Sequence, residues 1–324
     1  MKRRGITVLL GAALVALLTW QSLSMDVAYV VMGPGPTEDV LGVVTDEDET
    51  EQQIISADVE YDTNGELRLT TVRVKQSVTL AQALRFWMSN ENAIIPRDLV
   101  YPPGQSQEEI SAEQEADWAE SQTNAEQAAL DFLGQPAEIL VVSDGAGLLE
   151  GDAVLQVDGT VVDSLDDLEN FADSETDVIV ERDGAETTVE AVTLGDAELE
   201  VTREDPFGIE IHTEALDIGG PSAGLVFALG IVDLVEAEDL VGGLTVAGTG
   251  EIDAEGNVGG IGGIQQKIIA SSEAGAEVFL SPAANCPDAA SVAPDNMTIV
   301  KVETLADAVS ALRSINAGEQ VETC

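Results

Sequence analysis

The chain has 324 residues, enough for two or three small domains, and its 13 Lys and Arg residues stand against 61 Asp and Glu residues. The resulting formal charge of -48 argues against a nucleic-acid partner, because phosphate backbones are bound by basic patches. Such a charge is typical of an acidic surface that keeps a protein soluble in a salty medium. With one histidine and two cysteines, a zinc or iron site is not expected, and no lysine follows a glycine, as a Walker-type phosphate loop requires. We therefore expect no metal, no cofactor and no ATP.

Residues 1–27 are predicted to form a cytoplasmic tip and a transmembrane anchor. Three basic residues at positions 2–4 precede an uncharged stretch over residues 5–25, which as a helix is about 30 Å long and therefore crosses a bilayer. Basic residues before the span place the N-terminus in the cytoplasm and the rest of this single-pass protein outside the cell membrane. A cleaved signal peptide is the alternative, because "SLS" before Met25 is a tolerable cleavage site. The apolar character of residues 27–32 favours a retained anchor.

A region of strands and helices is expected over residues 28–133. Apolar and polar residues alternate over residues 54–61 and again over residues 66–74, on either side of Asn64 and Gly65. An Asn-Gly pair between two alternating runs is a strong signal for a tight turn, so we predict a β-hairpin here.

Two helices are predicted to follow this hairpin. The first covers residues 79–88 and has Thr79 and Gln82 at the spacing of a capping box. The second starts at Ser111 and reaches about residue 133, with Trp118 and Ala125 on its apolar side.

Between residues 134 and 200 the pattern changes to short strands and turns. The run "GLLEGDAVLQVDGTVV" is followed by a short helical segment with Ser164 as its cap, and by a hairpin that turns at Asp183 and Gly184. This segment resembles the PDZ domain family, which implies a β-rich domain that binds an extended peptide by strand addition and holds its terminal carboxylate in a turn. The resemblance places that turn just ahead of residues 139–142.

Residues 201–317 alternate strands with helices, and residues 318–324 form a tail. Strands are predicted over residues 207–214, 244–247, 277–280 and 298–302, and helices over residues 225–235, 264–274 and 305–312. Together with the preceding segments, this pattern predicts an α+β fold.

The turn "DIGGPSAG", residues 217–224, contains the serine that we expect to be the nucleophile, Ser222. It precedes the apolar helix, where unpaired backbone N–H groups and the helix dipole favour negative charge, so an oxyanion formed during acyl transfer is expected there, with Gly220 and Ala223 as backbone candidates. A serine before a helix is also a common cap, and this motif alone does not exclude that role.

Lys267 favours the role of nucleophile for Ser222 over that of a helix cap. It is the only Lys or Arg between Arg203 and Lys301, and it stands among glycines and apolar residues in the first turn of a predicted helix. Burial and the positive end of a helix both lower a lysine pKa, which for a general base must fall from about 10.4 toward 8 or below. We therefore predict that Lys267 is the base for Ser222.

Residues 207–312 resemble the proteolytic domain of Lon proteases, in the membrane-anchored, PDZ-containing branch called YlbL-like. The resemblance lies in "GPSAG", "GTGEID..G.V..IGGI.QK" and "AGA..V.LSPA.N". It implies peptide-bond hydrolysis through an acyl-enzyme, with Ser222 and Lys267 as a catalytic dyad and Thr249 as the hydroxyl that orients the lysine amine. Expected substrates are proteins or peptides near the membrane, and the oligomeric state stays open.

The sequence departs from the pattern of ATP-driven Lon proteases at two points. The chain has no ATPase module, and the position three before the serine, acidic in those enzymes, is Gly219, with Asp217 two residues earlier. Residues 65–74, "GELRLTTVRV", and 118–130, "WAESQTNAEQAAL", also resemble the opening strands and first long helix of a Lon proteolytic fold. The PDZ-like segment would then be inserted within the protease, and residues 66–74 would share a sheet with residues 207–214.

Two alternatives remain open. His212 lies ten residues before Ser222 on a predicted strand, so a Ser-His arrangement is the other candidate for catalysis. The alternative function is a non-catalytic, membrane-tethered PDZ scaffold with an inert Lon-like domain. The sequence also leaves open whether Cys286 and Cys324 form a disulfide, which an oxidising compartment permits.

Overall fold

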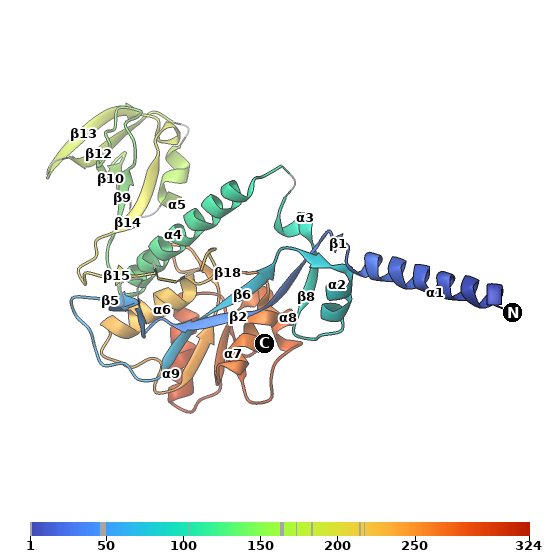
Figure 1. The fold of residues 1–324 in the computed structure, drawn as a ribbon. Coiled ribbons are helices and arrows are strands. Elements are labelled where there is room, and N and C mark those ends of the chain that lie inside the picture. Colours follow the sequence, from blue (N-terminus) through green and yellow to red (C-terminus); the bar gives the residue numbers. More distant parts are fainter. Residues whose placement is uncertain are drawn as a thin grey trace.

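The computed structural model of the chain describes residues 2–45, 50–102, 104–162, 165–172, 174–182, 184–213, 215–216 and 218–324. A six-stranded sheet at its centre has the order β20-β19-β16-β6-β2-β8 (Figure 1). In chain order these strands are β2 (Tyr29–Asp39), β6 (Glu66–Lys75), β8 (Ala93–Pro96), β16 (Thr245–Gly248), β19 (Val278–Pro282) and β20 (Thr298–Val302).

Strand β6 joins the two parts of this sheet. It pairs antiparallel with β2 and parallel with β16, and β16, β19 and β20 continue in parallel. Gly65, with a φ of +99°, lies against the backbone of Leu244, while the carbonyl of Leu244 accepts the Glu66 N–H and the carbonyl of Asn64 accepts the Gly243 N–H. The Asn-Gly turn therefore places β6 beside β16, because these long-range backbone bonds take the place of a local hairpin.

The predicted hairpin of residues 54–61 with residues 66–74 is therefore wrong. Strand β5 (Ile55–Ser56) pairs instead with β15 (Glu210–Ile211). For the same reason, the expected sheet shared by residues 66–74 and 207–214 is wrong, since β6 and β15 belong to separate sheets. What β6 does share with the later part of the chain is its ladder with β16.

Helices cover both faces of the central sheet, which gives three layers. Helices α4 (Gln107–Phe132), α6 (Gly224–Val235) and α9 (Leu305–Asn316) share one core with Val278 and Leu280 of β19. Helix α7 (Ile264–Glu273) and the short α8 (Cys286–Ala290) pack on the other face, in a cluster that contains Phe279. Successive residues of a strand point to opposite faces, so one apolar strand can fill both cores.

The helix starts follow their capping residues. Helix α2 (Leu80–Trp87) has the predicted capping box of Thr79 with Gln82. Helix α4 begins more than a turn earlier than predicted, because Ser106 and Glu109 form its capping box and the Ser111 start is wrong. The apolar helix predicted over residues 225–235 is α6, and every residue of α6 is buried.

The N-terminal helix α1 (Lys2–Leu23) projects away from the rest of the molecule in Figure 1. Its residues 6–23 are long and apolar enough to cross a membrane by length and composition, and none of that window is buried. The remaining short elements are α3 (Arg97–Val100) and the two-stranded ladders of β1 (Asp26–Val27) with β7 (Val78–Thr79), β3 (Val43–Thr45) with β4 (Glu51–Gln53) and β17 (Glu251–Ile252) with β18 (Val258–Gly259).

A second sheet lies between α4 and the later strands in sequence and stands apart from the central sheet in Figure 1. Its order is β13-β12-β10-β9-β14, with β11 beside β10, and it has its own apolar core. Its elements are β9 (Ala137–Val141), β10 (Ala153–Val157), β11 (Thr160–Val161), α5 (Leu165–Leu168), β12 (Thr176–Arg182), β13 (Ala185–Val192) and β14 (Leu199–Arg203).

This second sheet changes one expectation about peptide binding. Strand β9 pairs with β10 on one side and β14 on the other, so it has no free edge for an added strand where the sequence placed one. The predicted cap Ser164 and the turn residue Asp183 lie outside the described residues.

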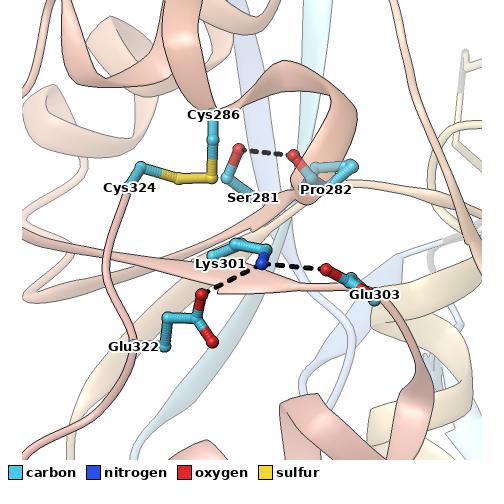
Figure 2. Close-up of a disulfide and its surroundings, with 7 residues drawn as sticks. All are labelled: Ser281, Pro282, Cys286, Lys301, Glu303, Glu322 and Cys324. Atoms are coloured by element: carbon cyan, nitrogen blue, oxygen red, sulfur yellow. Dashed lines mark hydrogen bonds and ion pairs between the residues drawn. A yellow bond between two sulfur atoms is a disulfide. The ribbon is translucent and has the colours of Figure 1, made fainter.

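A disulfide joins Cys286 and Cys324, which answers the question that the sequence left open. Figure 2 shows this bond, and in the same view Lys301 of β20 lies between Glu303 and Glu322, to both of which it is ion-paired. The C-terminal residues are thus fixed to α8 and β20 rather than mobile as a free tail would be.

Candidate active site

Three side chains that the sequence singled out meet at one point. The Lys267 amine donates to Ser222 Oγ at 2.6 Å and to Thr249 Oγ1 at 2.8 Å. The Thr249 hydroxyl in turn donates to the backbone carbonyl of Ser222 at 2.9 Å. Thr249 therefore contacts both members of the pair and fixes the amine relative to the serine.

Ser222 is presented by the turn that leads into α6. Ala223 is the N-cap residue of this helix, and the Ser222 carbonyl also accepts the Gly250 N–H at 3.0 Å. Gly224 has no room for a side chain, since a Cβ there would lie 2.7 Å from Ile252 and 3.0 Å from Ser121 Oγ. The small residues after the serine thus allow the start of α6 to pack closely against β17 and α4.

Lys267 is presented by the first turn of α7. Its N-cap residue, Gly263, has a φ of +72° and packs so closely on Val72 and Met32 that a Cβ would lie within 2.8 Å of each. This contact brings the start of α7 under β2 and β6 and directs the lysine into the interior, where 2% of its surface is exposed. Only glycine combines the left-handed backbone with that close approach.

Burial lowers the pKa of Lys267 to about 7, because desolvation disfavours the charged amine, and the nearby Glu251 carboxylate acts in the opposite direction. An amine with this pKa is partly neutral at physiological pH. It can then accept a proton from the serine hydroxyl that lies within hydrogen-bond distance.

The two backbone candidates for an oxyanion site differ. The Gly220 N–H donates to the Gln114 carbonyl at 3.3 Å, so it is already used. The Ala223 N–H, at the start of α6, has no acceptor among the residues that the structure describes. Of the two, Ala223 is therefore the better donor to a developing oxyanion.

Helix α4 holds the serine turn by three contacts that sequence reasoning missed. The Gln114 carbonyl accepts the Gly220 N–H, the Trp118 indole donates to Thr213 Oγ1 at 3.1 Å, and Ser121 Oγ donates to the Pro221 carbonyl at 3.1 Å. The polar side chains of α4 gave only the weak signal of an amphipathic helix, because their partners lie about a hundred residues away.

Glu251 is the other residue of the site that the sequence did not single out. Burial and the carboxylate of Asp117 raise its pKa, and the charge of Lys267 opposes that rise. It lines the pocket that contains Ser222 and Lys267. Its position two residues after Thr249 in "GTGE" was the available signal.

An open pocket of about 690 Å³ contains the pair. Residues 70–74 of β6 line the pocket, and Trp118, Ile218 and Pro221 are among its other lining residues. The described pairing of β16 with β6 ends at Leu69, so residues 70–74 have β2 on one side and no strand on the other. The pocket thus offers unpaired strand backbone beside a serine hydroxyl.

His212 lies elsewhere. Its imidazole, just after the end of β15, is 3.3 Å from Ser56 Oγ and 3.3 Å from a carboxylate oxygen of Glu210, and it does not line the pocket of Ser222. The Ser-His alternative has no support in this geometry. Asp217 lies outside the described residues.

A family model described as the Lon protease (S16) C-terminal proteolytic domain matches residues 140–313. The chain is 31% identical over 137 residues to Lon protease 2 of Syntrophobacter fumaroxidans, covering 40% of this chain and 17% of that protein. It is 36% identical over 109 residues to the Lon protease of Campylobacter jejuni, covering 32% of this chain and 14% of that protein. It is 38% identical over 104 residues to the Lon protease of Rickettsia typhi, covering 31% of this chain and 13% of that protein. The matched stretch therefore spans less than a fifth of the length of these curated relatives.

Proposed function

The chain belongs to the Lon protease family through the C-terminal proteolytic domain that it carries, and we propose that it is a membrane-tethered serine endopeptidase with Ser222 as nucleophile and Lys267 as general base. One observation carries the proposal. A buried lysine with a pKa of about 7 lies 2.6 Å from the hydroxyl of a serine that opens onto a pocket.

The reaction runs through an acyl-enzyme. As Ser222 Oγ attacks the carbonyl carbon of the substrate, neutral Lys267 takes the hydroxyl proton, and the oxyanion accepts a hydrogen bond from the Ala223 N–H. The C–N bond then breaks, and Lys267 gives its proton to the leaving amine. Water attacks the resulting ester, Lys267 accepts one of its protons, and the acid product leaves as Ser222 regains its hydroxyl.

Thr249 positions the base. Its hydroxyl accepts from the Lys267 amine and donates to the Ser222 carbonyl, so it holds the amine on the line toward Oγ. The substrate is proposed to lie extended along residues 70–74 of β6, whose open side faces the pocket. Such a chain is held by backbone hydrogen bonds, which suits a protease that cuts unfolded or flexible segments.

The second sheet is proposed to be a PDZ-like recognition domain of the membrane-anchored branch of the family. The family match begins at residue 140, within β9, so it includes this sheet and does not assign it separately. Support comes from β14, an edge strand in the described part of the chain that packs beside α5. Strand addition of a peptide requires an exposed sheet edge, which β14 supplies, and α5 lies beside that edge.

Anchoring and independence from ATP are further parts of the proposal. The length and composition of residues 6–23 support a span, and the basic residues at positions 2–4 support a cytoplasmic N-terminus, which places the catalytic domain outside the cell. No lysine follows a glycine in the sequence, which supports cleavage without a Walker-type ATPase step.

The test is hydrolysis of a fluorescent, unfolded protein such as labelled casein by the full chain in detergent. We expect cleavage without ATP and a loss of at least about a thousandfold in Ser222→Ala and Lys267→Ala. Ser310→Ala, which changes an exposed serine of α9, is the matched control and should keep the parent rate. Cleavage that persists in Ser222→Ala, or that requires ATP, contradicts the proposal. A parent protein that neither cleaves nor acylates favours the tethered scaffold instead.

A further inference from the structure

Helix α2 has an apolar side that nothing in the described chain covers. Leu84, Trp87 and Met88 are spaced i, i+3, i+4 and are 45%, 76% and 80% exposed. The adjoining side of the same helix packs Ala83 and Phe86 against the cluster of Val31 and Val78. We call Leu84, Trp87 and Met88 the α2 patch. A surface helix whose apolar side extends beyond the face that packs on the body is typical of a contact with a partner.

The α2 patch lies beside the point where α1 leaves the molecule. Only Ser24 and Met25 separate α1 from β1, which pairs with β7, the strand that runs directly into α2. The Leu80 N–H at the start of α2 donates to the Met25 carbonyl, and α1 and α2 are in contact. Figure 1 shows α2 at the end of the body from which α1 projects.

The chain segment that contains α2 is far less acidic than the whole protein, although Asp26, which pairs with Thr79, and Glu273, which lines a hollow with Lys75 and Phe86, also lie near it. Residues 70–101 contain four Lys or Arg and two Asp or Glu, in a chain with a formal charge of -48. The four cations, Arg73, Lys75, Arg85 and Arg97, are all exposed. Basic side chains around an apolar stripe that includes a tryptophan are suited to the headgroup region of an anionic bilayer. A second copy of so acidic a chain would meet repulsion instead.

We propose that α2 makes a second membrane contact, in which Leu84, Trp87 and Met88 enter the boundary between headgroups and acyl chains beside α1, while Lys75 and Arg85 lie near lipid phosphates. This inference rests on the proposed anchoring by α1 and goes beyond it. A single span leaves the body free to swivel, whereas two contacts fix its orientation. Because β6 runs from Lys75 into residues 70–74 of the catalytic pocket, docking holds the pocket close to the membrane surface.

The test uses the full chain in vesicles of equal parts phosphatidylcholine and phosphatidylglycerol. Both native cysteines are in the disulfide, so Met88→Cys supplies a single free thiol for an environment-sensitive NBD label. We expect the label emission to shift to the blue and to be quenched by lipids that carry a spin label near the headgroup. Labels at Leu14→Cys in α1 and at Val161→Cys, an exposed position of β11, report the span and the distal surface. The first should be quenched by lipids that carry the spin label deep in the acyl chain, because position 14 lies near the middle of the span, and the second should be quenched by neither kind of lipid.

Substitutions in the α2 patch and at the basic residues beside it separate the apolar contribution to membrane contact from the electrostatic one. Trp87→Ser should abolish quenching at position 88, and Lys75→Glu with Arg85→Glu should weaken it as the salt-sensitive part, both with quenching at position 14 intact. Quenching at position 14 but not at position 88 overturns the α2 contact and leaves the anchor standing. Quenching at neither position overturns both. A blue shift at position 88 in vesicles without quenching by the spin-labelled lipids also overturns it, because a protein surface then covers the patch.

Discussion

At the scale of single residues, the buried amine of Lys267 links catalysis to stability. Its environment lowers the lysine pKa from 10.5 to about 7, which means that folding disfavours the charged form. Over the pH range between those two values the unfolded chain binds more protons than the folded one, so the free energy of unfolding rises with pH there. The same desolvation that makes the amine a base therefore destabilises the fold at neutral and acidic pH.

Lys267→Met should be inactive and yet more stable at pH 7, by up to about 4 kcal/mol, because the substitution removes the cost of burying a charge and keeps a side chain of similar length. The gain should be largest below pH 7 and should shrink toward pH 10. Urea denaturation of the variant and the parent at several pH values measures it. A variant that is less stable than the parent at pH 6 contradicts the assigned burial cost.

Glu251→Gln tests how a neighbouring carboxylate affects the pKa of Lys267. The Glu251 carboxylate raises the pKa of Lys267, so its removal should move the rise of kcat/KM with pH, expected near pH 7 in the parent, to lower pH. The pH profile of peptide hydrolysis measures the shift. Glu255→Gln, an exposed change in the neighbouring turn, is the control and should leave the midpoint in place. A midpoint that moves upward in Glu251→Gln is the opposing result.

At the scale of secondary-structure elements, α4 acts as a brace for the turn before α6. Its contacts reach Gly220, Pro221 and Thr213, which lie on the turn or lead into it, and Trp118 also meets Phe227 of α6 edge to face, with ring centroids 5.5 Å apart. The position of Ser222 thus depends on a helix that comes about a hundred residues earlier in the chain.

Ser121→Ala should lower kcat by roughly ten- to a hundredfold with little change in KM, since the lost hydrogen bond to the Pro221 carbonyl loosens the serine turn and not the substrate wall on β6. The stability loss should be only about 1 kcal/mol. Ser111→Ala, the same change at an exposed site of the same helix, should match the parent. Equal kcat in both variants would show that the brace does not position the serine.

The pairing of Ser222 with Lys267 could be predicted from the turn, the isolated lysine and its place at a helix start, and the place of Thr249 beside them followed from the resemblance of "GTGEID" to Lon proteolytic domains. The contacts of α4 with the turn before α6 could not be predicted, because Gln114 makes its contact through the backbone and the partner of Ser121 lies far along the chain. The hairpin prediction failed for a related reason. Alternation shows that residues 66–74 form a strand but does not choose its neighbour, and that choice depends on the contact of Gly65 with Leu244.

At the scale of the whole molecule, the two parts of the chain on either side of the second sheet form one structure, because β6 and β16 are neighbours in the central sheet and α4 shares a core with α6. The last residues are then fixed by the disulfide. It links residues 38 positions apart, and Asn285, next to Cys286, accepts the Ile261 N–H and donates to the Ile261 carbonyl beside the pocket.

Cys324→Ser should lower the free energy of unfolding by about 4 kcal/mol, because the unfolded chain is then no longer restricted by a closed loop. Thermal unfolding with and without a reducing agent measures this effect. The reducing agent should bring the parent to the Tm of the variant and leave the variant unchanged. A parent whose Tm is insensitive to reduction contradicts a stabilising bond.

The central claim is that Lys267 activates Ser222, and acylation of Ser222 by a fluorophosphonate tests it most directly. The full chain is treated with the probe, and the modified peptide is located by mass spectrometry across a pH series. We predict one adduct, on Ser222, that forms faster as the pH rises through about 7 and is absent in Lys267→Ala. An adduct on another residue, or equal labelling of Ser222 in Lys267→Ala, would contradict the claim.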